Sequence, residues 1–274
     1  MPPRRLTPAA PGWGLFRAVR VGILLLILVL VAAKTWQDQY RSRRWHEPLY
    51  VSIYPIAADD SEVTRRYLDQ VDAGTFKDID SFFAQEARRT RLVLDEPFRT
   101  RLRGELRQQP PVRAPGAGPL GTALWSLQLR YWAWRVGLHV HEPEDIRVFV
   151  LFHDPALTPA VPHSLGLMKG LIGVVYAFAT PAMSGTNSVV IAHEMLHTLG
   201  ATDKYDPATD APLYPSGYAD PGQEPRYPQR LAELMAGRRA LDPAHFEQAE
   251  SLREVVIGPQ TAAEIHWPQH SRPR

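Results

Sequence analysis

Hydrophobic residues along the chain fall into short β-branched and aromatic runs and into longer stretches with helical spacing. The short runs predict strands at residues 50–56, 91–94, 145–152 and 173–179. Helical spacing predicts helices at residues 61–71, 76–88, 120–136, 243–254 and 259–266. Segments rich in proline and glycine predict loops at residues 108–119 and 206–228. We therefore expect one folded domain over residues 49–274, beginning with the first strand.

The predicted helix at 120–136 carries an unusual number of large apolar side chains. They are Trp125, Leu127, Leu129, Tyr131, Trp132 and Trp134. An aromatic face of this kind is far more often part of a core than a ligand site. We therefore expect this face to be buried.

Another helix, directly after the last predicted strand, is apolar on nearly all sides, which is typical of a buried helix. Its apolar residues are Val189, Val190, Ile191, Ala192, Met195, Leu196 and Leu199. The same helix contains His193, Glu194 and His197. Polar side chains inside a core cost several kcal/mol unless they are paired or coordinate a cation. The pattern therefore favours a metal site over an exposed polar face.

The spacing of these polar residues fits the chemistry of a zinc hydrolase. Residues four apart lie one turn above each other, so His193 and His197 can direct their imidazoles at one ion. Such a site also needs a third protein ligand, an open position for water and a carboxylate that accepts the water's proton. Glu194 is placed to be that general base. Gly200 can turn the chain at the end of the helix, so that Asp203 returns as the third ligand.

The motif HEMLHTLGATD, residues 193–203, resembles the zinc signature of the metzincin metallopeptidases. It is similar to the variant with aspartate as third ligand that the snapalysin family carries. The resemblance implies that His193, His197 and Asp203 bind Zn²⁺. It covers roughly residues 187–237.

Two further positions match snapalysin-like chains. The segment AELMAG, residues 232–237, resembles the metzincin methionine turn, with Met235 as its methionine. Tyr205 occupies the place of a tyrosine that helps to bind or polarise the substrate carbonyl. Alternatively, Met235 is a core methionine at a helix end and Tyr205 is a phenol packed on the turn.

The resemblance implies an α+β fold, which we expect to be a metzincin-like catalytic domain. Its parts would be a twisted mixed sheet, a central active-site helix, a methionine turn and a small helical C-terminal subdomain. The strand at 173–179 would be an antiparallel edge strand over the cleft that pairs with an extended peptide. Tyr214 and Tyr218, in the loop after the motif, would line this cleft, and His153 and His163 lie before the cleft strand as loop histidines or substrate contacts.

The implied activity is that of a zinc metalloendopeptidase acting on peptide or protein substrates. In this mechanism zinc activates a water, Glu194 takes and returns its proton, and Tyr205 steadies the oxyanion. Aspartate in place of the more usual histidine ligand leaves the site less positive, so the water should be somewhat less acidic. A long region before the motif is a further departure from the small snapalysins.

Other interpretations stay open. A catalytically inactive zinc-binding module would keep the same ligands, and a zinc hydrolase of another clan would use a downstream glutamate such as Glu233 in place of Asp203. A purely structural membrane protein would bind no metal. His139 and His141 form an HxH pair, which is more typical of a surface turn than of a metal site when no partner motif is near.

Residues 15–33 form an apolar segment that predicts membrane targeting. We interpret it as a transmembrane signal anchor between a basic tail, residues 1–14, and a juxtamembrane linker, residues 34–48. A cleaved signal peptide is the alternative. Arginines and lysines flank both sides equally, so charge does not set the orientation. The order of basic start, apolar run and large domain favours a domain outside the cytoplasm, periplasmic or extracellular, and secreted if the segment is cleaved.

Composition changes this picture in two respects. Five of the 31 basic residues and none of the 29 acidic residues lie in residues 1–34, which leaves 26 basic and 29 acidic residues in the remainder. The basic balance therefore belongs to the N-terminus, and nothing indicates nucleic-acid binding. The chain has no cysteine, which excludes disulfides and thiolate zinc ligands.

Overall fold

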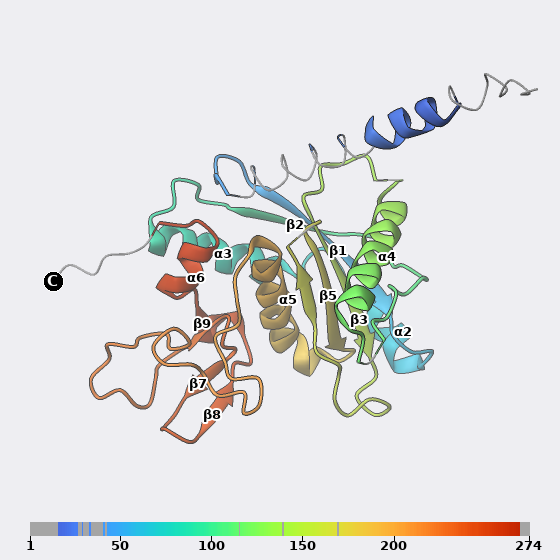
Figure 1. Ribbon diagram of the computed structural model, residues 1–274. Coiled ribbons are helices and arrows are strands. Elements are labelled where there is room, and N and C mark those ends of the chain that lie inside the picture. Colours follow the sequence, from blue (N-terminus) through green and yellow to red (C-terminus); the bar gives the residue numbers. More distant parts are fainter. Residues whose placement is uncertain are drawn as a thin grey trace, which may run out of the picture. The chain divides into compact units, whose positions relative to one another are not determined.

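A mixed five-stranded sheet lies at the centre of residues 41–268 (Figure 1). The computed structural model describes residues 16–26, 29, 33, 41, 43–114, 116–138, 140–168 and 170–268. The strands follow the order β2-β1-β3-β5-β4, with β1 at Leu49–Ala57, β2 at Phe98–Leu102, β3 at Ile146–His153, β4 at Leu165–Leu167 and β5 at Ile172–Phe178. All neighbours pair in parallel except β4, which is antiparallel to β5. The architecture is therefore mixed α/β.

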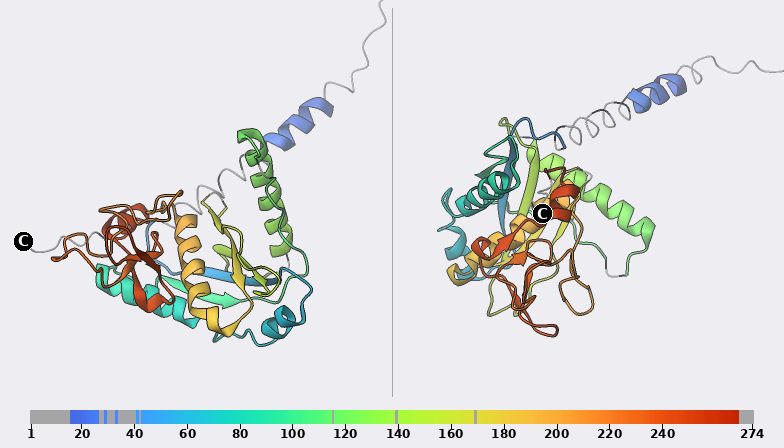
Figure 2. Two further views of the ribbon diagram at one scale, coloured as in Figure 1. Left: turned by 90° about the horizontal axis from the view of Figure 1, so that it is seen from below. Right: turned by 90° about the vertical axis from the view of Figure 1, so that its left-hand side faces the viewer.

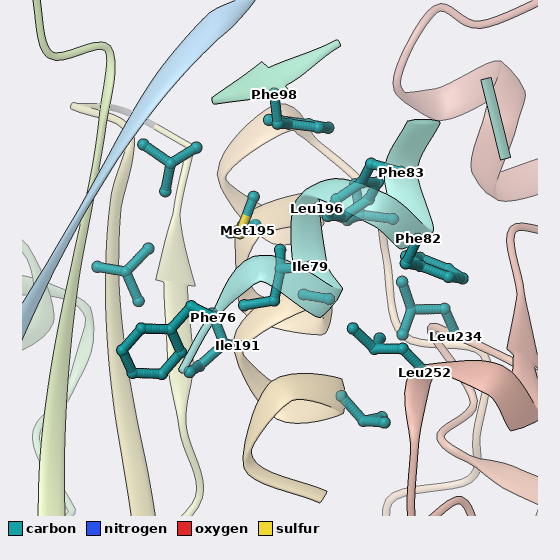
Figure 3. Close-up of a cluster of buried hydrophobic side chains, with 14 of the residues drawn as sticks. Phe76, Ile79, Phe82, Phe83, Phe98, Ile191, Met195, Leu196, Leu234 and Leu252 are labelled. Carbon is teal, nitrogen blue, oxygen red and sulfur yellow. The ribbon is translucent and has the colours of Figure 1, made fainter. Parts of the chain in front are cut away.

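Helices cover both faces of this sheet, because the parallel strands are apolar on both sides. One face packs against α2 (Glu62–Leu68), α3 (Lys77–Thr90) and α5 (Ser184–Leu199). Figure 3 shows the core between α3 and α5, where Phe83, Ile79 and Leu196 meet. The other face packs against α4 (Pro119–Gly137), which Figure 1 shows on the far side of the sheet from α5.

The segment after α5 consists of loops, short strands and one short helix. The elements are β6 (Ala232–Glu233), β7 (Arg238–Ala240), β8 (Phe246–Gln248), β9 (Val255–Val256) and α6 (Pro259–Glu264). Single 3₁₀ turns lie at Pro181–Met183 and Leu252–Glu254. In place of the small helical C-terminal subdomain that we expected, this part of the chain combines paired strands with α6.

Most predicted elements are confirmed with shifted ends, but two are wrong. The predicted helix at 243–254 is replaced by β8 and a 3₁₀ turn, because Asp242 accepts hydrogen bonds from the backbone N–H groups of Ala244 and His245 and forms a turn. The predicted strand at 91–94 is absent, because α3 ends there at Arg91 in the left-handed conformation. The second strand begins instead at Phe98.

Two further expectations are corrected by the packing. The strand at 172–178 does precede α5, but it pairs in parallel with β3, and the antiparallel edge is the three-residue β4. The sequence of β4, Leu-Gly-Leu, is too short to be recognised as a strand pattern. On α4, Trp125 and Leu129 are buried as expected, whereas Tyr131 and Trp134 are exposed.

Contacts divide the chain into two units, residues 1–40 and residues 41–274. In the first unit, residues 16–26, 29 and 33 are helical, and the rest of the predicted segment 15–33 lies outside the described residues. Of the helices that the structure describes, none combines the length and the apolar character needed to cross a membrane. His139, one half of the HxH pair, also lies outside the described residues.

Candidate metal centre

The last turns of α5 carry three of the predicted site residues into one cleft. His193 and His197 lie one turn apart on the same side of the helix, and their ring centroids are 4.6 Å apart. The helix ends at Gly200, whose φ of 104° is a left-handed conformation that glycine adopts without strain. This turn sends the chain back toward the histidines and brings Asp203 beside them.

Backbone carbonyls fix the orientation of both imidazoles. His193 Nδ1 lies 3.0 Å from the Leu234 carbonyl oxygen, and His197 Nδ1 lies 2.8 Å from the Ala201 carbonyl oxygen. A carbonyl oxygen only accepts hydrogen bonds, so each Nδ1 must carry the proton. In the neutral imidazoles both Nε2 atoms therefore present lone pairs.

These two lone pairs meet a carboxylate oxygen. Asp203 Oδ1 lies 3.1 Å from His193 Nε2 and 3.0 Å from His197 Nε2, and the ligand atoms of the three residues all lie within 4.8 Å of one another. Three acceptor atoms this close need a proton or a cation between them. Ligands of a tetrahedral zinc ion lie about 3.3 Å apart at bond lengths of about 2.0–2.1 Å. The group could therefore hold a metal ion.

The pKa shifts within the cluster also indicate a site for a cation. Burial alone would raise the pKa of Asp203, but hydrogen bonds that the Nε2–H groups of protonated imidazoles donate to it from His193 and His197 hold this pKa well below its usual range. Burial acts to lower the pKa of His193, yet the neighbouring carboxylates of Asp203 and Glu194 carry it above its usual value. The cluster thus favours an added positive charge.

Glu194 lies beside the cluster, and its hydrogen-bonding capacity is not fully used by the described residues. Its side chain is 4% exposed, and Oε2 has no hydrogen-bond partner among the described residues. Burial raises the pKa of Glu194, while the two adjacent histidines lower it. A buried carboxylate oxygen without a partner is costly, so its presence at the wall of a cleft indicates a functional partner such as a water or substrate proton.

The cluster opens into a cleft of about 750 Å³. On one side it is lined by the segment from Ala160 to Gly166, which includes the start of β4. Across from it, the lining residues are Asp203, Tyr205, Asp210, Ala236, Gly237, Arg238 and Gln248. Arg238 and Asp210 form an ion pair at 2.8 Å within this wall. The cleft thus has an edge strand on one side and a polar loop wall on the other.

Of the aromatic and histidine residues that we expected near the substrate, the structure places only some in the cleft. Tyr205 and His163 line the cleft, whereas His153, Tyr214 and Tyr218 are not part of its lining. Tyr218 is buried, and its hydroxyl lies 3.0 Å from that of Tyr227. The ring of Tyr205 lies 6.5 Å from that of His193, and burial, together with the nearby carboxylates, raises the pKa of its phenol. Tyr205 is therefore a neutral hydrogen-bond donor at the cleft.

The predicted methionine turn lies against the site through its backbone. Met235 is fully buried in the tight turn after β6, and Leu234 in the same turn supplies the carbonyl that orients His193. The Met235 carbonyl oxygen accepts a hydrogen bond of 2.9 Å from the Lys204 backbone N–H. The turn therefore holds both a ligand from α5 and the segment that carries Asp203.

Glu233, the alternative third ligand, has a different role. Its Oε1 accepts from Gly258 N at 3.0 Å and Thr261 Oγ1 at 2.6 Å, and its Oε2 accepts from the backbone N–H groups of Met235 and Ala236 at 2.6 and 3.1 Å. Both oxygens are thus used inside the protein, and Glu233 is not among the ligand atoms of the cluster. Glu233 therefore holds the Met235 turn in place through these hydrogen bonds.

Sequence reasoning missed an ion pair that holds the third ligand. Lys204 is 2% exposed, and its Nζ lies 2.8 Å from Glu264 Oε2 on α6 and 2.7 Å from the Thr202 carbonyl oxygen. Glu264 in turn accepts hydrogen bonds from the backbone N–H and the hydroxyl of Thr202. The residues on both sides of Asp203 are therefore tied to α6. A lysine next to a loop aspartate resembles a solvated residue, so no pattern indicated this role.

Gly166 on β4 is the second residue that sequence reasoning missed. A Cβ atom at this position would lie 2.5 Å from His197 Cβ and 2.7 Å from the Glu194 carbonyl oxygen. Glycine therefore lets the edge strand approach the helix that carries the ligands. A side chain here would force β4 and α5 apart.

Comparison with protein-family models found no match, and no curated protein matched the chain either. Function has to be inferred from the residues and their geometry.

Proposed function

We propose that this chain is a zinc-dependent endopeptidase of metzincin-like type. The observation that carries the proposal is the convergence of two imidazole lone pairs and a carboxylate oxygen in an open cleft, beside Glu194, whose Oε2 has no hydrogen-bond partner among the described residues. Metal ligands alone would also suit a binding module. The additional buried base favours an enzyme that moves a proton.

Zinc is the ion that best fits this group of residues. Two histidine nitrogens and one carboxylate oxygen are a known catalytic ligand set, and the cleft that these residues line would leave room for a water molecule on a bound ion. The same donor types also serve non-haem iron. Glu194 favours hydrolysis, because a general base beside the ligands is needed to deprotonate water.

Each residue then has a defined task. When bound by His193, His197 and Asp203, zinc would polarise the scissile carbonyl and lower the pKa of a water molecule. Glu194 accepts the proton of the attacking water and returns it to the leaving amine. The neutral phenol of Tyr205 donates a hydrogen bond to the oxygen that becomes negative in the transition state.

Peptides are the substrates that the cleft suits best. The edge strand β4 pairs with β5 on one side only, and its first two residues, Leu165 and Gly166, line the cleft. A free strand edge binds an extended peptide through backbone hydrogen bonds, which requires little of the peptide's sequence. The proposal is therefore an endopeptidase acting on unfolded protein segments or peptides.

The test is metal analysis combined with turnover of a peptide library by the purified full chain. We expect one zinc ion per chain, cleavage inside the peptides, loss of cleavage with a chelator and recovery when zinc is added back. Bound zinc without cleavage of any peptide or denatured protein would instead favour an inactive zinc-binding module. Absence of any bound divalent metal would contradict the proposal as a whole.

We also propose that residues 15–33 attach the chain to a membrane as a signal anchor, with the domain from residue 49 outside the cytoplasm. The support is the apolar sequence of this segment behind a basic start. Cells expressing the chain should retain it in the membrane fraction after alkaline extraction, and protease added to the outer side should degrade the domain. Release by alkali or full protection from protease would contradict this location.

A further inference from the structure

Helix α4 carries two apolar faces, and only one of them is covered. Trp125, Leu129 and Ala133 are buried against the sheet, together with Tyr54 and Phe149. The opposite side carries a second set of large apolar residues, each between 51% and 88% exposed. This outer stripe consists of Leu120, Leu124, Leu127, Tyr131, Trp134 and Leu138.

The outer stripe is continuous along the whole helix. Its members are spaced alternately four and three residues apart, so that they span only about 80° of the helix circumference at 3.6 residues per turn. The rings of Tyr131 and Trp134 are 5.9 Å apart within it. In both views of Figure 2 this helix stands at the outer side of residues 41–268. Single exposed apolar residues are ordinary, but a continuous stripe of this size marks a binding surface.

The charges on α4 distinguish between two possible partners of the outer stripe, a second copy of the chain and a membrane surface. The helix has no acidic residue, and its two arginines, Arg130 and Arg135, flank the stripe on opposite sides. In a parallel pair of such helices these two positions face each other across the interface, so a second copy would place arginine against arginine. Like charges in that place oppose association, and no acidic residue of the helix offsets them.

We propose that the outer stripe of α4 lies in the surface of an anionic lipid bilayer. Leucine side chains would enter the acyl region, Tyr131 and Trp134 would lie at the headgroup level, and the two arginines would meet lipid phosphates. The helix cannot cross the bilayer, because its other face is packed on the sheet. This contact would hold the domain against the membrane independently of the peptidase chemistry.

Spin labelling tests this proposal directly, because the chain contains no cysteine. Leu127→Cys places a single nitroxide on the outer stripe, and Val93→Cys, at a position 97% exposed on the loop after α3, is the matched control. The full chain is mixed with vesicles of phosphatidylglycerol and phosphatidylcholine. We expect the label at 127 to become accessible to oxygen and shielded from a water-soluble nickel chelate, while the label at 93 stays accessible to the chelate.

The two variants differ only in the labelled position, so the label at 93 shows the effect of attachment through residues 15–33, and the difference between the two positions reports immersion of the outer stripe. Equal chelate access at both positions would overturn the proposal. Dipolar broadening at 127 without lipid would overturn it in favour of a second copy of the chain. Peptide cleavage by the same labelled proteins reports the proposed function separately.

The role of charge is tested in the same background. Arg130→Gln and Arg135→Gln should each lower the ratio of immersed to exposed label at 127 by about fivefold, and removal of phosphatidylglycerol should have a similar effect. Arg65→Gln and Arg66→Gln on α2, whose side chains are 63% and 66% exposed, are the controls and should leave the ratio unchanged. Unchanged immersion in the α4 variants would contradict binding to anionic lipid.

Discussion

Glu194→Gln is expected to lower peptide hydrolysis by about 10²- to 10⁴-fold, the range that a positioned general base contributes. Glutamine keeps the shape of the side chain but cannot accept the proton of the attacking water. The ligand atoms of His193, His197 and Asp203 are unchanged, so zinc should stay bound at one ion per chain. Cleavage rates and metal content of the same preparation measure both effects.

Stability separates this catalytic role from a structural one. Oε2 of Glu194 is buried without a partner among the described residues, so loss of its charge removes an unfavourable burial. The melting temperature of the metal-free Gln variant should therefore equal or exceed that of the wild type. Glu62→Gln on α2, with a side chain 62% exposed, is the control and should change neither rate nor stability. Full hydrolysis by the Glu194 variant would refute the proposed mechanism.

The ligand cluster was predictable because most of it is local. Two histidines four residues apart share a helix face in any α-helix, and a glycine three residues further on ends the helix and turns the chain. Asp203 follows within one turn of that point. Only short-range geometry is needed, and the structure brings His193, His197 and Asp203 together as the spacing indicated.

The residues that hold the ligands in place were not predictable, because they come from distant segments of the sequence. The carbonyl that orients His193 belongs to Leu234, and the carboxylate that pairs with Lys204 belongs to Glu264. Neither contact leaves a periodic pattern in the sequence. The edge strand β4 is hidden for another reason: three residues around Gly166 are too few for an alternation to be recognised.

Helix α4 shows a third limit of pattern reasoning. A helix that is apolar all round is normally buried all round, and the many aromatic residues therefore indicated core. The sheet packs against only one side of the helix. Trp125 is buried there, while Trp134 faces outward. Apolar content thus predicts how much surface needs a partner, but not whether that partner belongs to the same chain.

Glu264→Ala is expected to destabilise the protein by about 3–5 kcal/mol, the cost of leaving a buried charge without its partner. Lys204 is 2% exposed, and Glu264 is the only carboxylate within ion-pair distance of it among the described residues. Unfolding by denaturant of the metal-free chain measures this cost. Exposed pairs contribute far less, so Glu247→Ala, which removes the surface partner of Arg239, is the matched control and should cost about 1 kcal/mol or less.

The same substitution should also weaken metal binding, because the pair fixes the backbone on both sides of Asp203. Loss of residues that orient a ligand typically lowers metal affinity by about 10- to 100-fold. The double variant Lys204→Met/Glu264→Leu removes both charges and should recover most of the stability, since apolar side chains can replace a buried ion pair. It should not recover full zinc affinity, because Thr202 then loses its hydrogen bonds to Glu264 and the segment of Asp203 is less restrained. Wild-type zinc affinity in the double variant would mean that Asp203 is held by the Met235 turn alone, and the positioning role of Lys204 and Glu264 would be disproved.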